Sequence, residues 1–128
     1  MSAPRPTDAE LAILRVIWQL GPSTVGAIRD VLEEARPTRY TTVLKFLQIM
    51  TAKGLVRREE SGRPHIYHAV YSETRTQRQL LRDLLDRAFG GSADALVMQA
   101  LATTRASAAE LKAVESLLGK RKKGSSRS

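Results

Sequence analysis

Apolar side chains near the N-terminus recur at intervals of three and four positions, which is the spacing of two amphipathic helices. Thr7 and Glu10 have the spacing of a capping box, and Gly21-Pro22 ends the first apolar stripe. Ser23 or Thr24 can cap the second helix. The stripes consist of Leu11, Leu14, Ile17 and Trp18 in the first helix and of Val25, Ile28, Val31 and Leu32 in the second.

A third helix is expected from Thr38 to Lys53, followed by Gly54 as a left-handed C-cap. The positive charge of Lys53 suits the negative end of the helix dipole. On a helical wheel one face is apolar and the opposite face carries hydroxyls and a lysine. The apolar face holds Val43, Phe46, Leu47 and Met50, and the opposite face holds Thr38, Thr41, Lys45, Gln48 and Ala52.

A β-hairpin is expected directly after this helix. Residues 55–58 and 66–70 are strand-like runs, and Ser61-Gly62-Arg63-Pro64 between them is typical of a turn. Three helices followed by a hairpin are the order of a winged helix-turn-helix domain, whose last helix enters the major groove of DNA. The predicted fold is therefore mainly α with a small β-hairpin.

The polar face of the third helix and the turn of the hairpin are the candidate DNA-binding surface. Threonine hydroxyls and a lysine ammonium suit base edges and phosphates, and an arginine in the wing suits the DNA backbone. The candidate residues are Thr38, Arg39, Tyr40, Thr41, Thr42, Lys45, Arg63 and His65.

Each of these residues also has an ordinary structural explanation. Thr41 and Thr42 can cap the first helical turn, with capping and contact equally weighted for Thr42. Lys45 and Arg63 can be solvated surface charges. The wheel places the ring of Tyr40 on the apolar side, so we expect that ring to be packed while its hydroxyl reaches a phosphate.

Three short amphipathic helices are expected in residues 76–89, 92–101 and 107–118, with Gly90-Gly91 as the first break. Short helices are marginal alone, so their apolar stripes need a partner. That partner is either the N-terminal domain or a second copy of the chain, and we favour a homodimer because helix-turn-helix proteins commonly bind two half-sites. The dimerisation candidates are Leu81, Leu84, Leu85, Phe89, Leu96, Val97, Leu101, Val114, Leu117 and Leu118.

The distribution of charge along the chain separates the same N-terminal and C-terminal segments as the apolar pattern does. The 128 residues carry a formal net charge of +8, which favours a polyanionic partner. Residues 1–72 are the expected DNA-binding domain and residues 73–118 the dimerisation region, which is close to neutral. Residues 119–128 hold five Lys/Arg and no Asp/Glu, and we expect a disordered basic tail that is either solvated or an electrostatic arm on DNA.

The motifs Tyr40-Thr41-Thr42-Val43-Leu44, Lys53-Gly54-Leu55-Val56 and Gly62-Arg63, preceded by Glu10-Leu11 and Ile17-Trp18, resemble the penicillinase repressor family of the BlaI and MecI type. The resemblance covers roughly residues 6 to 118. It implies a dimeric, winged-helix transcriptional repressor. In family members induced by a β-lactam sensor, an Asn-Phe bond is cut, whereas the aligned pair here is Gln99-Ala100. The resemblance therefore does not extend to the cleaved bond, so it leaves open whether proteolysis at or near Gln99-Ala100 inactivates the protein, and an upstream sensor stays unidentified.

The remaining chemistry is sparse. The chain has no cysteine, which excludes thiolate metal sites and the cysteine cluster of copper-responsive relatives. His65 and His68 fall on opposite faces of a strand, and no nucleophile with a nearby base is evident, so we expect no enzyme activity, no metal and no cofactor. Without a membrane span or signal peptide the protein is expected to be cytoplasmic.

The sequence therefore predicts a repressor that binds an operator inverted repeat in double-stranded DNA as a homodimer. The alternative is a protein-interaction or architectural nucleic-acid-binding module without a specific operator, because a winged fold can serve either role.

Overall fold

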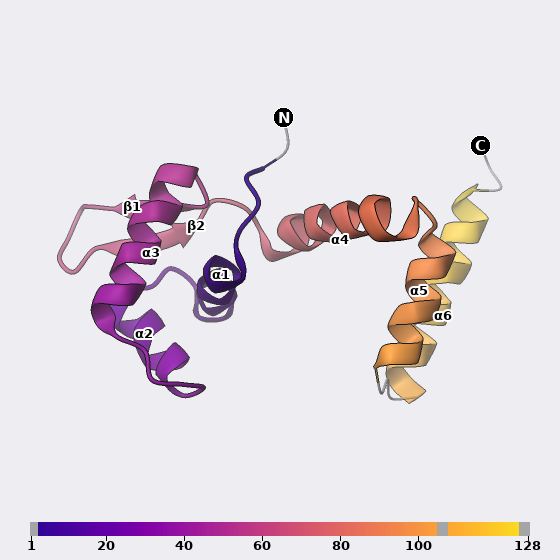
Figure 1. The fold of residues 1–128 in the computed structure, drawn as a ribbon, viewed down its shortest axis with the longest axis horizontal. Helices are drawn as coiled ribbons and strands as arrows, with labels where there is room; N and C mark the ends of the chain where they lie inside the picture. The colour runs from indigo at the N-terminus through magenta and orange to yellow at the C-terminus, as the bar shows by residue number, and fades with distance from the viewer. Residues whose placement is uncertain (1–2, 105–107, 126–128) are drawn as a thin grey trace. The chain divides into compact units, whose positions relative to one another are not determined.

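The computed structural model describes residues 3–104 and 108–125, with the backbone alone for residues 118 and 120–125 (Figure 1). Its contacts divide the chain into two units, Met1–Asp83 and Leu84–Ser128. The sequence predicted this division between residues 72 and 73. The next helix begins directly after that predicted boundary, at Glu73, and its first turns belong to the first unit, where Thr76 is buried.

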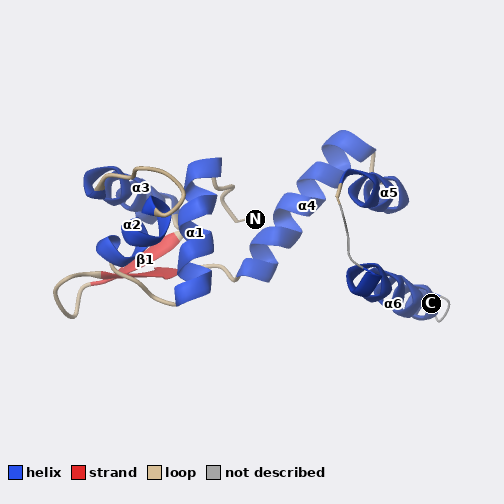
Figure 2. Ribbon diagram, turned by 90° about the horizontal axis from the view of Figure 1, so that it is seen from below, coloured by secondary structure: helices blue, strands red, loops and turns tan. Residues whose placement is uncertain are grey.

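The first unit contains the elements that the hydrophobic pattern predicts, in the predicted order (Figure 2). Three helices are followed by an antiparallel hairpin, and the hairpin loop projects beyond the helices in both Figure 1 and Figure 2. The helices are α1 (Asp8–Leu20), α2 (Val25–Glu33) and α3 (Tyr40–Lys53), and the strands are β1 (Val56–Glu59) and β2 (Ile66–Ala69).

Local capping explains where the helices of this unit begin and end. Thr7 caps α1 in a capping box with Glu10, as predicted. The side chain of Thr24 caps α2, accepting from the backbone N–H of Ala27. α3 is capped at its C-terminus by Gly54, whose φ of 82° and ψ of 17° are left-handed and favour glycine.

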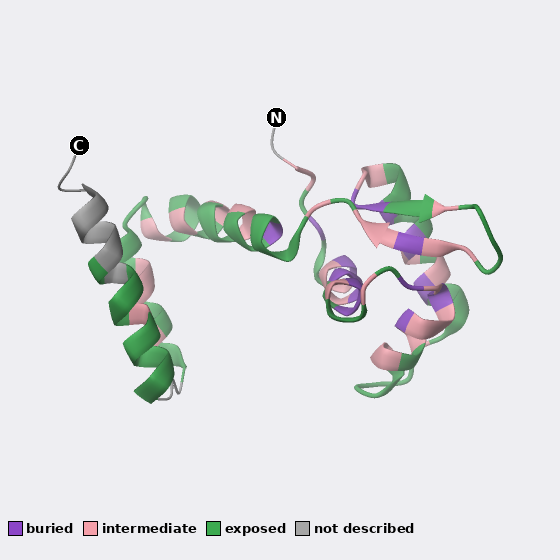
Figure 3. Cartoon of the chain, turned by 180° about the vertical axis from the view of Figure 1, so that it is seen from behind, coloured by how far each residue is buried: buried purple, intermediate pink, exposed green. Residues whose placement is uncertain are grey.

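The core of the first unit lies between the three helices and the hairpin (Figure 3). The sequence predicts that the core of the winged domain is closed by Leu14, Trp18, Ile28, Val43, Leu47 and Leu55, and five of these six are buried. The sixth, Trp18, packs partly buried against the cluster and donates its indole N–H to the carbonyl of Tyr71 at 3.1 Å. The buried apolar residues are Ile13, Leu14, Val16, Ile17, Val25, Ile28, Val43, Leu47, Met50, Leu55, Val56 and Tyr67.

The hairpin is joined to the segment before α2. Arg58 lies opposite Tyr67 in the β1–β2 register. Tyr67 also exchanges two backbone hydrogen bonds with Ser23, at 2.8 and 3.1 Å, which form an isolated bridge. Ser23 therefore fixes the hairpin to the helices, while Thr24 makes the cap. The Arg63–Pro64 peptide bond in the turn is cis.

The C-terminal part contains three helices: α4 (Glu73–Phe89), α5 (Ala93–Thr103) and α6 (Ala108–Ser125). Gly90 and Gly91 separate α4 from α5, both with positive φ. The sequence predicts a disordered tail from residue 119, whereas α6 continues to Ser125 in the structure. Lysine and arginine are good helix formers, and their charge is favourable at a helix C-terminus. Residues 126–128 lie outside the described part.

Candidate nucleic-acid interface

The outer face of α3 is exposed and polar, while its inner face anchors it in the core. Val43, Leu47 and Met50 are at most 1% exposed. Thr41, Thr42, Lys45 and Gln48 are all exposed on the other side. Thr41, Thr42 and Lys45 share a shallow pocket with Phe46 and Ile49, so hydroxyls and an ammonium lie beside apolar groups on this face. The base edges in the major groove of DNA present hydrogen-bond donors, acceptors and the methyl group of thymine, and these groups complement such a face.

The hydroxyls of Thr41 and Thr42 are not used to cap α3. Its N-cap residue is Arg39, which makes no side-chain capping hydrogen bond. Capping, the alternative explanation of these two threonines, is therefore not what they do. Their exposed hydroxyls are available to a ligand.

Thr38 lies before α3 and not on its outer face, contrary to the helical wheel. Its hydroxyl donates to the carbonyl of Arg36 at 2.9 Å. Its backbone N–H donates to the carboxylate of Glu33, and its carbonyl accepts from Nε of Arg29 at 3.0 Å. Arg29 and Glu33 are also an i,i+4 ion pair at 3.5 Å on α2. They hold the loop that leads into α3, a role that the sequence analysis missed although their spacing was visible.

The ring of Tyr40 is 50% exposed, so the expectation that it is packed was wrong. Tyr40 opens the first turn of α3, where no earlier helical turn covers it. It lines a groove shared with Leu44 of α3 and with Arg63 and His65 of the wing. The structure thus brings the start of α3 and the wing together on one side of the first unit.

The wing carries its charges near the turn. Arg63 is exposed and His65 half-buried. Arg58 on β1 forms an ion pair with Glu60, which lowers the pKa of that carboxyl. Nε2 of His68 is buried without a hydrogen-bond partner and lies 3.5 Å from a carboxylate oxygen of Glu59.

The C-terminal end of α3 is fixed by a buried carboxylate. Nζ of Lys53 lies 2.6 Å from Oε1 of Glu10, which also accepts the backbone N–H of Thr7 at 2.9 Å. Burial acts to raise the pKa of Glu10, but the hydrogen bonds from Lys53 and Thr7 and the charge of Lys53 together hold it below its ordinary value of 4.5. The ammonium of Lys53 is therefore paired with a carboxylate of the same chain.

The predicted dimerisation residues are open to solvent in the single chain. From residue 77 to residue 117, with the gap at 105–107, no side chain that the structure describes is fully buried. Leu81 and Leu84 on α4 are about half exposed, and Leu117 on α6 is 67% exposed. The others, half-buried, are Leu85, Phe89, Leu96, Val97, Leu101 and Val114; the side chain of Leu118 lies outside the described residues.

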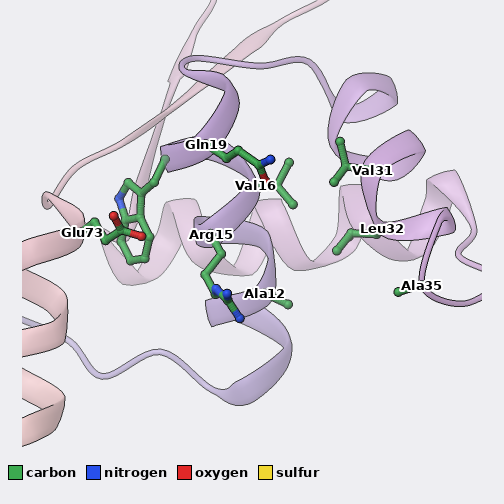
Figure 4. A pocket seen from close by; sticks show the side chains of 9 residues that line it. Ala12, Arg15, Val16, Gln19, Val31, Leu32, Ala35 and Glu73 are labelled. Atoms are coloured by element: carbon green, nitrogen blue, oxygen red, sulfur yellow. The ribbon is translucent and has the colours of Figure 1, made fainter. Parts of the chain in front are cut away.

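The first unit has a further pocket between α1 and α2 (Figure 4). Arg15 and Gln19 of α1 and Leu32 of α2 line it, together with Glu73 at the start of α4. None of the candidate DNA-binding residues is among its lining residues.

The sequence profile of the penicillinase repressor family matches residues 6–120, which is most of the chain. The chain belongs to the penicillinase repressor family. This confirms the resemblance drawn from the motifs around α3. Two proteins named transcriptional regulator BlaI, from two strains of Mycobacterium tuberculosis, are each 32% identical over 82 residues. These matches cover 63% of this chain and span 59% of the length of those relatives.

Two other proteins extend the comparison. An uncharacterised 16.5 kDa protein of Latilactobacillus sakei is 25% identical over 119 residues, covering 80% of this chain and 82% of that protein. The solution structure of Bacillus licheniformis BlaI, in its monomeric form with the blaP half-operator, matches with a TM-score of 0.50 and 23% identity. That match covers 58% of this chain and 90% of the other, and it confirms the winged-helix fold.

Among the described residues, every helix is too short or too polar to span a bilayer. No group of three or more His, Cys, Asp or Glu side chains in the same residues is placed to hold a metal ion.

Proposed function

We propose that this protein is a DNA-binding transcriptional repressor that reads an operator inverted repeat as a homodimer. Membership of the penicillinase repressor family supports the first part of the proposal. The observation that carries it is the division of α3 into an inner face that is at most 1% exposed and an outer face that is polar and exposed. Helix-turn-helix proteins present such an outer face to the base edges of the major groove.

Each side chain has a proposed role in this interface. Thr41, Thr42 and Lys45 contact base edges, because their polar groups are exposed on one face of α3. Arg39 and Tyr40 at the start of α3 and Arg63 and His65 of the wing contact phosphates. Thr38 contributes through the loop that it stabilises.

The homodimer is supported by the unpartnered apolar surface of α4, α5 and α6. Leu84, Met98 and Leu117 are between 49% and 67% exposed in one chain. Packing of these helices against a second copy removes that surface from water and places two copies of α3 on one duplex.

Selection of duplexes from a random library by the full-length protein, followed by titration at physiological salt, tests the proposal. A repressor of this kind enriches an inverted repeat and binds it ~10³-fold or more tightly than random duplex. Sedimentation of the free protein should show a dimer. Enrichment without any common sequence would favour the architectural or protein-interaction alternative instead.

A further inference from the structure

The segment ahead of α1 is tied to α4. The carbonyl of Ala3 accepts from the side-chain amide of Gln79, and a guanidinium nitrogen of Arg5 lies 2.7 Å from a carboxylate oxygen of Asp83. Pro4 and Pro6 flank Arg5, and each fixes its own φ. Residues 3–7, called here the N-terminal strap, therefore run as a stiff segment beside the middle of α4, where they contact Gln79 and Asp83.

The same strap is tied to the end of α3. The carbonyl of Arg5 accepts from Nζ of Lys53 at 3.4 Å, and that ammonium lies 2.6 Å from Glu10. Glu10 in turn holds the backbone N–H of Thr7, the last residue of the strap. Arg5 therefore reaches α4 with its side chain and α3 with its carbonyl.

These contacts are poorly explained as a source of stability alone. The side chains of Arg5 and Asp83 are 51% and 36% exposed, and ion pairs at such positions add little to the free energy of folding. These contacts join α3 to α4 through residues 3–7, and they therefore restrain the direction of α4 relative to α3. α3 carries the candidate base contacts, and α4 leads out of the first unit toward α5 and α6.

We propose that the N-terminal strap is a positioning device, which fixes the direction of α4 relative to α3 and so sets the operator spacing that a dimer accepts. Arg5, Gln79 and Lys53 are its positioning residues. This inference rests on the proposed function, since only a dimer has two copies of α3 to space. Half-site spacing is a geometric property of such dimers, because both copies must meet the same side of the duplex.

The binding test uses the full-length protein and the inverted repeat selected above, rebuilt with spacers one or two base pairs shorter or longer. The wild type should prefer one spacer by roughly tenfold, because both half-sites must be engaged at once. Arg5→Asp and Asp83→Arg should each flatten this preference to about threefold or less, with affinity for an isolated half-site unchanged, and the double exchange should restore it.

Arg78→Asp is the matched control, since it makes the same charge change at an exposed arginine of α4. It should keep the wild-type preference. Equal flattening by Arg78→Asp, retention of the preference in both single variants, or failure of the double exchange to restore it would overturn the proposal.

A second readout needs no DNA and separates failure of the strap from failure of the proposed function. The chain has no cysteine, so spin labels at Gln48→Cys on α3 and Gln77→Cys on α4, both exposed, are its only labelled sites. With an excess of unlabelled protein, the distance distribution within one chain should be narrow, broaden in Arg5→Asp and narrow again in the double exchange. If Arg5→Asp leaves the distance distribution between the two labels unchanged, the proposed role of the strap is contradicted, even where the operator is found.

Discussion

The ammonium of Lys53 lies 2.6 Å from the carboxylate of Glu10, which joins the last residue of α3 to the first turn of α1. The Glu10 side chain is 3% exposed and the Lys53 side chain 32% exposed. A carboxylate at this depth depends on its partners, because an uncompensated buried charge is strongly unfavourable. The pair therefore links the stability of the first unit to pH.

Acid should weaken the first unit through Glu10. Its pKa is held below the ordinary value of 4.5, so the pair's stabilising effect is complete above that pH and is lost as the pH falls through the folded value. Glu10→Gln removes this dependence. Urea unfolding followed by fluorescence of Trp18, the single tryptophan, should show that the wild type has a higher free energy of unfolding than Glu10→Gln at neutral pH, and that this difference shrinks as the pH falls below 4.5.

Glu34→Gln is the control for this pH dependence, because Glu34 is exposed at the end of α2. It should parallel the wild type. A constant difference between the wild type and Glu10→Gln across the pH range would show that the charge of Glu10 does not contribute.

Removal of single groups from the outer face of α3 should weaken specific binding without unfolding the protein. Lys45→Ala and Thr41→Ala should each cost about 1–3 kcal/mol on the selected operator and relax discrimination at one base pair. Titration against the operator and its single-base variants measures this. Lys112→Ala and Thr74→Ala change exposed residues of the same types elsewhere and should bind as the wild type does. Unchanged binding by both α3 variants would remove these residues from the interface.

The wing should act on DNA of any sequence. Arg63→Ala should weaken operator and random duplex by a similar factor, and it should reduce the slope of log affinity against log salt by about 0.9 if one phosphate contact is lost. Arg15→Ala, at an exposed arginine of α1, is the charge-matched control. The same slope for all three proteins would make Arg63 an ordinary solvated charge.

Charge on the apolar faces of α4 and α6 should separate the dimer. Leu84→Asp and Leu117→Asp place a carboxylate where we expect the second copy to pack, and sedimentation should show monomers with operator affinity reduced ~10²-fold or more. Leu20→Asp on α1 starts from the same exposure as Leu84, about half, and should leave the dimer intact. Dimers of both variants would point to a different interface.

Local signals in the sequence predicted the helices, the hairpin and their boundaries well. Thr7, Thr24 and Gly54 act through neighbours within a few residues, so their roles follow from spacing alone. The contact between Lys53 and Glu10 joins residues 43 positions apart and has no periodic signature. Such pairs depend on the tertiary packing of α1 against α3.

The residues around the start of α3 show where helical periodicity stops being informative. The wheel treated Thr38 as a helical position and Tyr40 as an inner one. The helix begins at Tyr40, so Thr38 belongs to the loop and the Tyr40 ring has no preceding turn to pack on. In α6, too, the helix extends beyond the apolar pattern, because lysine and arginine favour a helix without adding to an apolar stripe.

The division of labour across α3 has an evolutionary consequence. Its hold on the core comes from Val43, Leu47 and Met50, and substitutions on the exposed side commonly change folding stability by no more than about 0.5 kcal/mol. After gene duplication, the residues at Thr41, Lys45 and Gln48 can therefore diverge without a loss of folding. Under the proposed function, a new copy can thus acquire a different operator in a few substitutions, with little change in folding stability at each step.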